Sequence, residues 1–147
     1  MSTFAHVSAV SINQTVGDWA GNKARIISAI IGAKNRGARL IVFPEMCISG
    51  YSLGDCLLME GTLSRSWAML EELTAYSQDV VLILGLPIRH RDVLYNVAAV
   101  VSNGSIHGIV PKENLATGDV QYENRWFSGW PHSRVEHFQS STGALIP

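Results

Sequence analysis

The feature that most constrains the fold is a two-residue turn, Asn103-Gly104, between two runs rich in β-branched residues. A tight hairpin turn needs positive φ at both central residues, and Asn followed by Gly accepts this at low cost. The flanking runs are therefore predicted to pair antiparallel, Val97 to Val101 with Ile106 to Val110. At least part of the chain must then be built around an antiparallel sheet.

The amino-terminal part of the chain has the pattern of a strand, a helix and a second strand. The apolar run from Phe4 to Ile12 is typical of a buried strand, and so is "ARLIVFPE" at 38–45. Between them, apolar residues recur every three or four positions, which predicts an amphipathic helix over 20–37. Such a unit implies two parallel strands with a right-handed crossover. Together with the antiparallel hairpin, it predicts a mixed sheet.

A second helix and a further buried strand are predicted between these two parts. Apolar residues from Leu63 to Leu70 recur at helical spacing and predict a helix over 62–76, with Thr62 as its N-cap. The run "DVVLILGLP" at 79–87 is typical of a buried strand, and the charged "RHRD" after it should turn the chain. We expect both helices to cover one face of the mixed sheet.

The carboxyl-terminal segment 113–147 has no periodic stretch long enough to predict a helix or a strand. A compact domain rarely ends in about thirty residues without structure of their own. We therefore expect either an active-site loop packed against sequence that this chain lacks, or partial disorder. Trp126 and Trp130 should pack within this loop or cover a pocket. The chain is accordingly predicted to be a single partial domain, 1–147, with an irregular loop or tail at 113–147.

Composition excludes several classes of function. The formal net charge is −1 with scattered basic residues, so no nucleic-acid partner is expected, and a small uncharged or zwitterionic ligand fits better. Cys47 and Cys56 form neither a disulfide framework nor a zinc motif, and His132 and His137 have a poor spacing for a metal site. No leader-like or membrane-spanning run is found. We expect a cytoplasmic protein with no metal and no membrane partner.

Two charged residues lie where strands are predicted to end. Glu45 follows Pro44 at the carboxyl end of a parallel strand, the edge at which open α/β sheets bind their ligands. Lys112 follows Pro111, directly after the second strand of the hairpin. A lysine beside a carboxylate can stabilise a developing oxyanion while the carboxylate moves protons. We predict that Glu45 and Lys112 approach each other at one edge of the sheet. The alternatives are a surface carboxylate and an ordinary solvated lysine.

Three segments, taken in order, resemble the nitrilase (carbon-nitrogen hydrolase) superfamily: "LIVFPEMCISGYSLGDCLL", "DVVLILGLPIRHRDVLYNVAAVVSNGSIHGIVPKENLA" and "YENRWFSGW". Within it they are similar to the amino-terminal glutaminase domain of eukaryotic-type glutamine-dependent NAD synthetase. The likeness extends from Phe4 to about Phe138. It implies an α/β fold, a nitrilase-like α-β-β-α sandwich, of which only the amino-terminal part of the full domain is present.

The resemblance assigns roles to two residues of a Glu-Lys-Cys triad. It makes Glu45 of "FPE" the general base and Lys112 of "PKENLA" the residue that stabilises the tetrahedral intermediate. The family's nucleophilic cysteine lies downstream of the lysine motif, and this sequence has no cysteine after Cys56. The nucleophile is therefore expected to be absent from this chain.

Four further residues are candidates with weaker support. Glu123 of "YENRW" is aligned with a second, supporting glutamate of the family, or else forms a structural ion pair with Arg125 or another basic group. Tyr51 either lines the amide pocket, supports the loop that carries Glu45, or packs in the core. Cys47 could face the same side as Glu45 from two residues away, but a small thiol beside a strand end is more often packed. Cys56 ranks lower.

In the intact enzyme the resemblance implies hydrolysis of glutamine and delivery of ammonia to a synthetase domain. That domain uses ATP and Mg²⁺ to amidate nicotinic acid adenine dinucleotide, whereas no cofactor is implied for the glutaminase part. A homo-oligomer is expected for the intact enzyme. We expect this chain itself to be inactive. The alternatives are a non-catalytic interaction or regulatory isoform, and another nitrilase-superfamily amidase that recruits Cys47.

Overall fold

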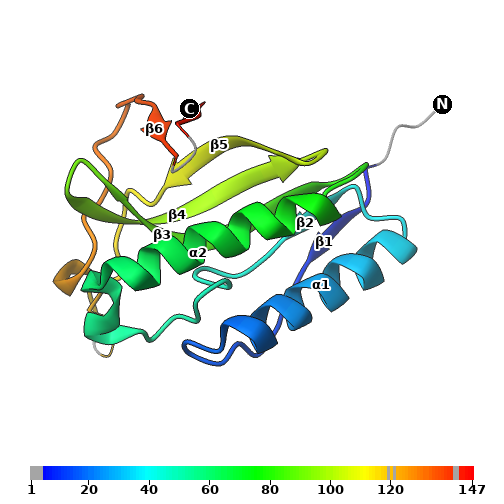
Figure 1. Cartoon of the computed structure of the whole chain (residues 1–147), viewed down its shortest axis with the longest axis horizontal. Helices are drawn as coiled ribbons and strands as arrows, with labels where there is room; N and C mark the ends of the chain where they lie inside the picture. Colours follow the sequence, from blue (N-terminus) through cyan, green and yellow to red (C-terminus); the bar gives the residue numbers. More distant parts are fainter. Residues whose placement is uncertain (1–4, 119, 121, 141–142) are drawn as a thin grey trace.

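The computed structural model describes residues 5–118, 120, 122–140 and 143–147, and contains a five-stranded mixed sheet with two helices on one face (Figure 1). The sheet order is β1-β2-β3-β4-β5, parallel from β1 to β3 and antiparallel from β3 to β5. In chain order the elements of this layer are β1 (Val7–Ala9), α1 (Trp19–Asn35), β2 (Leu40–Val42), α2 (Glu60–Leu73), β3 (Val81–His90), β4 (Val93–Ser102) and β5 (Ser105–Pro111).

The parallel pair of β1 and β2 and the hairpin form as the sequence predicts, and β2 and β3 make a second parallel pair. The first strand is shorter than the run from Phe4 to Ile12, since only Val7–Ala9 pairs with β2 and Phe4 lies outside the described residues. In the hairpin, Asn103 and Gly104 both have positive φ, 46° and 78°. The turn between β3 and β4 likewise has positive φ at both central residues, 49° at Arg91 and 63° at Asp92.

The two helices lie side by side over the sheet, as predicted (Figure 1). Helix α1 begins after Asp18, whose carboxylate accepts a hydrogen bond from the Gly21 amide at 2.9 Å. The prediction of Thr62 as the N-cap of α2 is wrong, because the helix already begins at Glu60 after the extended Met59. The Thr62 amide donates to the Met59 carbonyl at 3.0 Å, so Thr62 belongs to the first turn.

The main core lies between the helices and one face of the sheet. Leu82, Leu84 and Leu86 of β3 are fully buried there against Ile30 of α1 and Leu70 of α2. Alternate β4 residues extend this face through the register Leu82–Val101, Leu84–Ala99 and Leu86–Val97. Because side chains alternate along a strand, the intervening β4 residues point to the opposite face.

The described part of 113–147 is largely irregular but contains three short elements. They are a 3₁₀ turn, η3 (Glu123–Arg125), and two strands that pair antiparallel, β6 (Phe138–Gln139) and β7 (Leu145–Ile146). The segment packs on the sheet and on α2, since the Ile109 amide donates to the Pro147 carbonyl at 2.8 Å and the ring centroids of Phe138 and Trp67 lie 4.9 Å apart. Among the described residues, no helix has the length and apolar character needed to span a bilayer.

The hairpin turn gives a first test. Gly104→Val should lower the free energy of unfolding by about 1 kcal/mol or more, because a β-branched residue is costly at positive φ. The surroundings leave space for a side chain, since an added Cβ would meet only the Gln78 amide nitrogen at 3.5 Å. Urea denaturation measures the change. Gly118→Val is the control, because Gly118 has open space and no positive φ, and an equal loss in both variants would contradict the argument.

Candidate active site

Three charged side chains from distant parts of the sequence meet at one edge of the sheet. The Lys112 ammonium lies 3.0 and 3.1 Å from the two carboxylate oxygens of Glu45. It also lies 3.2 and 3.0 Å from the two oxygens of Glu123. The prediction that Glu45 and Lys112 approach each other is therefore confirmed, and Glu123 pairs with Lys112 rather than with Arg125.

Glu45 is held by a loop that crosses directly over β3. The Phe43 amide donates to the Ile83 carbonyl at 3.0 Å, and the Ile48 amide donates to the Gly85 carbonyl at 3.2 Å. A Cβ on Gly85 would lie 2.6 Å from the Met46 nitrogen and 2.9 Å from the Glu45 Cα. Only glycine at this strand position lets the loop approach so closely.

Lys112 is fixed through its backbone as well as its side chain. Its amide donates to the Asn96 carbonyl at 2.9 Å, and its carbonyl accepts from the Trp130 amide at 3.0 Å. Partial burial disfavours the charged form of Lys112, but hydrogen bonds and charge from Glu123 and Glu45 outweigh it, so the pKa of Lys112 is raised. The ammonium therefore stays charged well above neutral pH.

Glu123 is the buried member of the site, with 4% of its side chain exposed. Burial opposes its charge, yet its pKa is lowered by hydrogen bonds from Tyr51, Ala116 and Lys112. The Tyr51 hydroxyl donates to Oε1 at 2.6 Å, and the Ala116 amide donates to Oε2 at 2.6 Å. With its oxygens occupied in this way, Glu123 is a fixed anion rather than a group ready to exchange a proton.

Tyr51 supports the site through Glu123. Burial raises the pKa of its hydroxyl, and the neighbouring carboxylates raise it further, so the phenol remains a hydrogen-bond donor at all ordinary pH values. Of the three sequence-based alternatives for Tyr51, core packing is wrong, and the residue does line the pocket beside Glu123. Tyr51 is 41% exposed and is not a core residue.

Two residues of the site were not identified from the sequence. Asn96 is 3% exposed and donates from Nδ2 to Glu45 at 3.1 Å and to Glu123 at 3.2 Å. Gly85 has no side chain, and this lets the loop that carries Glu45 pass close to β3. A polar residue inside the apolar run of β4 and a glycine inside β3 were the available signals, since both weaken a strand unless another role requires them.

The two cysteines are not part of this cluster. Cys47 is 1% exposed and packs in the main core, where its thiol donates to the Gly85 carbonyl at 3.6 Å. Burial raises the pKa of Cys47 to about 12, whereas a nucleophilic cysteine needs accessible thiolate. Cys56 is exposed, within a 3₁₀ turn at Gly54–Leu58.

A pocket of about 420 Å³ adjoins the buried carboxylate. Glu123 and Tyr51 contribute its polar wall, and aromatic rings supply much of the rest. Its lining residues are Tyr51, Ser52, Gly54, Leu57, Val120, Tyr122, Glu123, Trp126 and Phe127. Its volume and mixed lining suit a small polar molecule.

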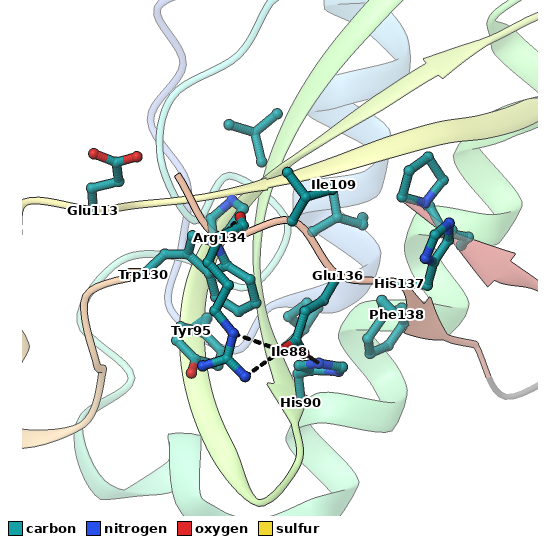
Figure 2. Close-up of a pocket in the computed structure, with 15 residues that line it drawn as sticks. Ile88, His90, Tyr95, Ile109, Glu113, Trp130, Arg134, Glu136, His137 and Phe138 are labelled. Carbon is teal, nitrogen blue, oxygen red and sulfur yellow. Dashed lines mark hydrogen bonds and ion pairs between the residues drawn. The ribbon is translucent and has the colours of Figure 1, made fainter. Parts of the chain in front are cut away.

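A second cavity, of about 260 Å³, lies on the helix-facing side of β4 (Figure 2). Pro111 and Glu113, the two sequence neighbours of Lys112, line it, but Lys112 does not. Tyr95 lines it, whereas the adjacent Asn96 points to the charged cluster. Its charged groups compensate one another, since Glu136 lies 2.7 Å from His90 and also pairs with Arg134. Trp130 was predicted either to pack within the loop or to cover a pocket, and it does both. Its ring centroid lies 5.1 Å from that of Tyr95, and it lines this cavity.

Comparison with known proteins gives one consistent family. The carbon-nitrogen hydrolase profile matches residues 6–142. Glutamine-dependent NAD(+) synthetase of Mycobacterium tuberculosis strain H37Rv is 40% identical over 124 residues, 83% of this chain and 18% of the relative. The human enzyme of the same name is 38% identical over 130 residues, 87% of this chain and 18% of the relative. The chain thus spans about a fifth of the length of these curated relatives.

Solved structures agree with the sequence comparison. A glutamine-dependent NAD(+) synthetase from Cytophaga hutchinsonii superposes with a TM-score of 0.94 at 33% identity, over 97% of this chain and 24% of that one. An amidase from Nesterenkonia sp. has a TM-score of 0.72 at 16% identity, over 96% of this chain and 53% of that one. The second likeness concerns the fold alone.

The close passage over Gly85 leads to a second test. Gly85→Ala should lower the free energy of unfolding by about 1 to 3 kcal/mol, since the added methyl group forces the Glu45 loop away from β3. Chemical denaturation measures the loss. Gly108→Ala in β5 is the matched control, because its Cβ would meet only the Pro147 carbonyl at 3.5 Å. Equal stability of the Gly85 variant and the native chain would show that the loop does not need this glycine.

The burial of Cys47 leads to a third test, by thiol titration at pH 8. We expect one thiol to react rapidly with Ellman's reagent in the native chain and both to react in denaturant, because Cys47 is both inaccessible and protonated. Cys56→Ser should abolish the rapid phase, and Cys47→Ser should leave it unchanged. Rapid reaction of Cys47 in the folded protein would contradict the placement of this residue in the core.

Proposed function

The chain belongs to the carbon-nitrogen hydrolase family, and on that premise we propose that it forms part of a glutamine amidohydrolase site. The observation that carries the proposal is the sharing of the Lys112 ammonium between half-exposed Glu45 and buried Glu123. The homology with glutamine-dependent NAD(+) synthetases over most of the chain supports glutamine as the amide substrate. The activity of the whole enzyme is proposed for the larger protein of which these residues would be a part.

Glu45 is the proton carrier in the proposed mechanism. Half of its side chain is exposed, so a reacting group can reach it, whereas the oxygens of Glu123 are enclosed. Glu45 takes the proton from an attacking thiol as sulfur bonds to the amide carbon. It then gives that proton to the nitrogen as the carbon–nitrogen bond breaks and ammonia leaves. Water then attacks the thioester carbon and gives a proton to Glu45, and the carbon–sulfur bond breaks as Glu45 returns that proton to sulfur.

Lys112 supplies the fixed positive charge in this scheme. The amide oxygen becomes an oxyanion when the thiol attacks, and a pre-positioned ammonium stabilises that charge without reorganisation. The raised pKa of Lys112 supports this assignment, because it keeps the group protonated throughout the reaction. The pocket beside Glu123 would hold the remainder of the amino acid.

The attacking thiol is proposed to come from a segment outside these 147 residues. Cys47 is buried with a pKa of about 12, and Cys56 is absent from the lining of the pocket beside Glu123. We propose that the ammonia serves an ATP- and Mg²⁺-dependent synthetase domain of the intact enzyme, in the cytoplasm and as a homo-oligomer. This glutaminase part has no proposed cofactor of its own.

Activity and binding measurements together test the proposal. Incubated with glutamine, the 147-residue chain should release ammonia several orders of magnitude more slowly than an intact glutaminase, because the Glu-Lys pair lacks its nucleophile. Glutamine should nevertheless shift the NMR signal of the Trp126 indole N–H, whereas the Trp19 signal serves as an internal control.

Two results would count against the proposal. Turnover that is lost in Cys47→Ser would show that Cys47 is the nucleophile and that the reaction belongs to a different amidase. The absence of any Trp126 shift at saturating glutamine would remove the substrate assignment. Leucine, which has a similar size but no side-chain amide, is the matched ligand control.

A further inference from the structure

Asn96 makes hydrogen bonds with all three charged residues of the site, through its side chain with two of them and through its backbone with the third. Its side-chain nitrogen donates to Glu45 Oε2 at 3.1 Å and to Glu123 Oε1 at 3.2 Å. Its backbone carbonyl accepts from the Lys112 amide at 2.9 Å. The two N–H bonds of a single primary amide are thereby divided between two carboxylates.

The two hydrogen bonds from the Asn96 amide matter because the site holds more negative than positive charge. Two carboxylates share one ammonium, so one negative charge is left without a cation. Two like charges that share one cation favour uptake of a proton by one of the pair. Neutral donors must oppose that uptake, and Glu45 has fewer of them than Glu123, which also accepts from Tyr51 and Ala116.

Burial fixes the geometry of the bridge. Asn96 is 3% exposed and lies in the middle of β4, opposite Pro87 of β3. The strand backbone therefore sets the position of the amide, and the amide sets the spacing of the two carboxylates. Among the described residues, the ionisable groups that face this position are Glu45 from the loop after β2, Tyr51 further along that loop, Lys112 after β5 and Glu123 in η3.

We infer that Asn96 is a positioning residue, which holds Glu45 and Glu123 at the two N–H bonds of one amide nitrogen and keeps both ionised around Lys112. The inference rests on the proposed function in one respect, namely that an ionised Glu45 is the state that accepts a proton from the nucleophile. Asn96 itself exchanges no proton and acts only through the carboxylates to which it donates. Its effect is on the position of Glu45 before the reaction begins.

Carboxyl titration tests this inference without any need for turnover. The side-chain carboxyl carbons of Glu45 and Glu123 are followed by ¹³C NMR from pH 2.5 to 8, with Glu45→Gln and Glu123→Gln used only for assignment. In Asn96→Ala the protonation constant of one member of the pair should rise about tenfold, a shift of one pKa unit. Asn96→Ser, which keeps a single donor, should give a smaller rise and covers the case in which the alanine variant does not fold.

Ser77→Ala is the matched control for loss of stability. Ser77 is fully buried and its hydroxyl also makes two hydrogen bonds, to Thr74 and from Gly104, at the hairpin turn. This variant should be destabilised without any change in the two carboxyl titrations. Unchanged titrations in both Asn96 variants, or an equal change in Ser77→Ala, would overturn the inference. Loss of glutamine binding alone would bear on the proposed function and not on Asn96.

Discussion

The buried charge of Glu123 is the constraint on which the site depends. A carboxylate that is 4% exposed cannot remain ionised unless cations and hydrogen-bond donors replace its water. Lys112, Tyr51, Asn96 and the Ala116 amide supply that replacement from three separate segments: the loop after β2, β4 and the stretch after β5. Each of these segments is therefore held at the position that the Glu123 carboxylate requires. The Lys112 ammonium also donates to Glu45, so the same contacts fix the position of Glu45.

The sheet makes this arrangement possible because one strand serves two faces. Tyr95 and Val97 of β4 pack toward the helices, and Asn96 between them points to the charged cluster. The same strand receives the Lys112 backbone from β5, while β3 supplies the glycine over which the Glu45 loop crosses. Core packing on one face of the sheet thus sets the positions of the polar groups on the other face.

The sequence predicted most of the fold and the outer members of the site. Asn103-Gly104 specified the hairpin, and the strand ends at Glu45 and Lys112 indicated where charges would gather. Asn96 and Gly85 could not be predicted in their roles, since these depend on how strands and loops pack in three dimensions. The register that sets Asn96 opposite Pro87, and the loop that passes over Gly85, appear only once the chain is folded. The same limit applies to the N-cap of α2, where Thr62 had a suitable side chain but the backbone at Met59 decided where the helix began.

The central claim is that Lys112 and buried Glu123 stabilise each other and thereby hold the site together. A double-mutant cycle in the free energy of unfolding at pH 7 tests it, with Lys112→Met, Glu123→Gln and the combined variant. Because Lys112→Met leaves a buried carboxylate without its cation, we expect a coupling energy of about 1 kcal/mol or more between the two positions. Changes that add to within about 0.3 kcal/mol would contradict the account, since they would show that the two residues do not depend on each other.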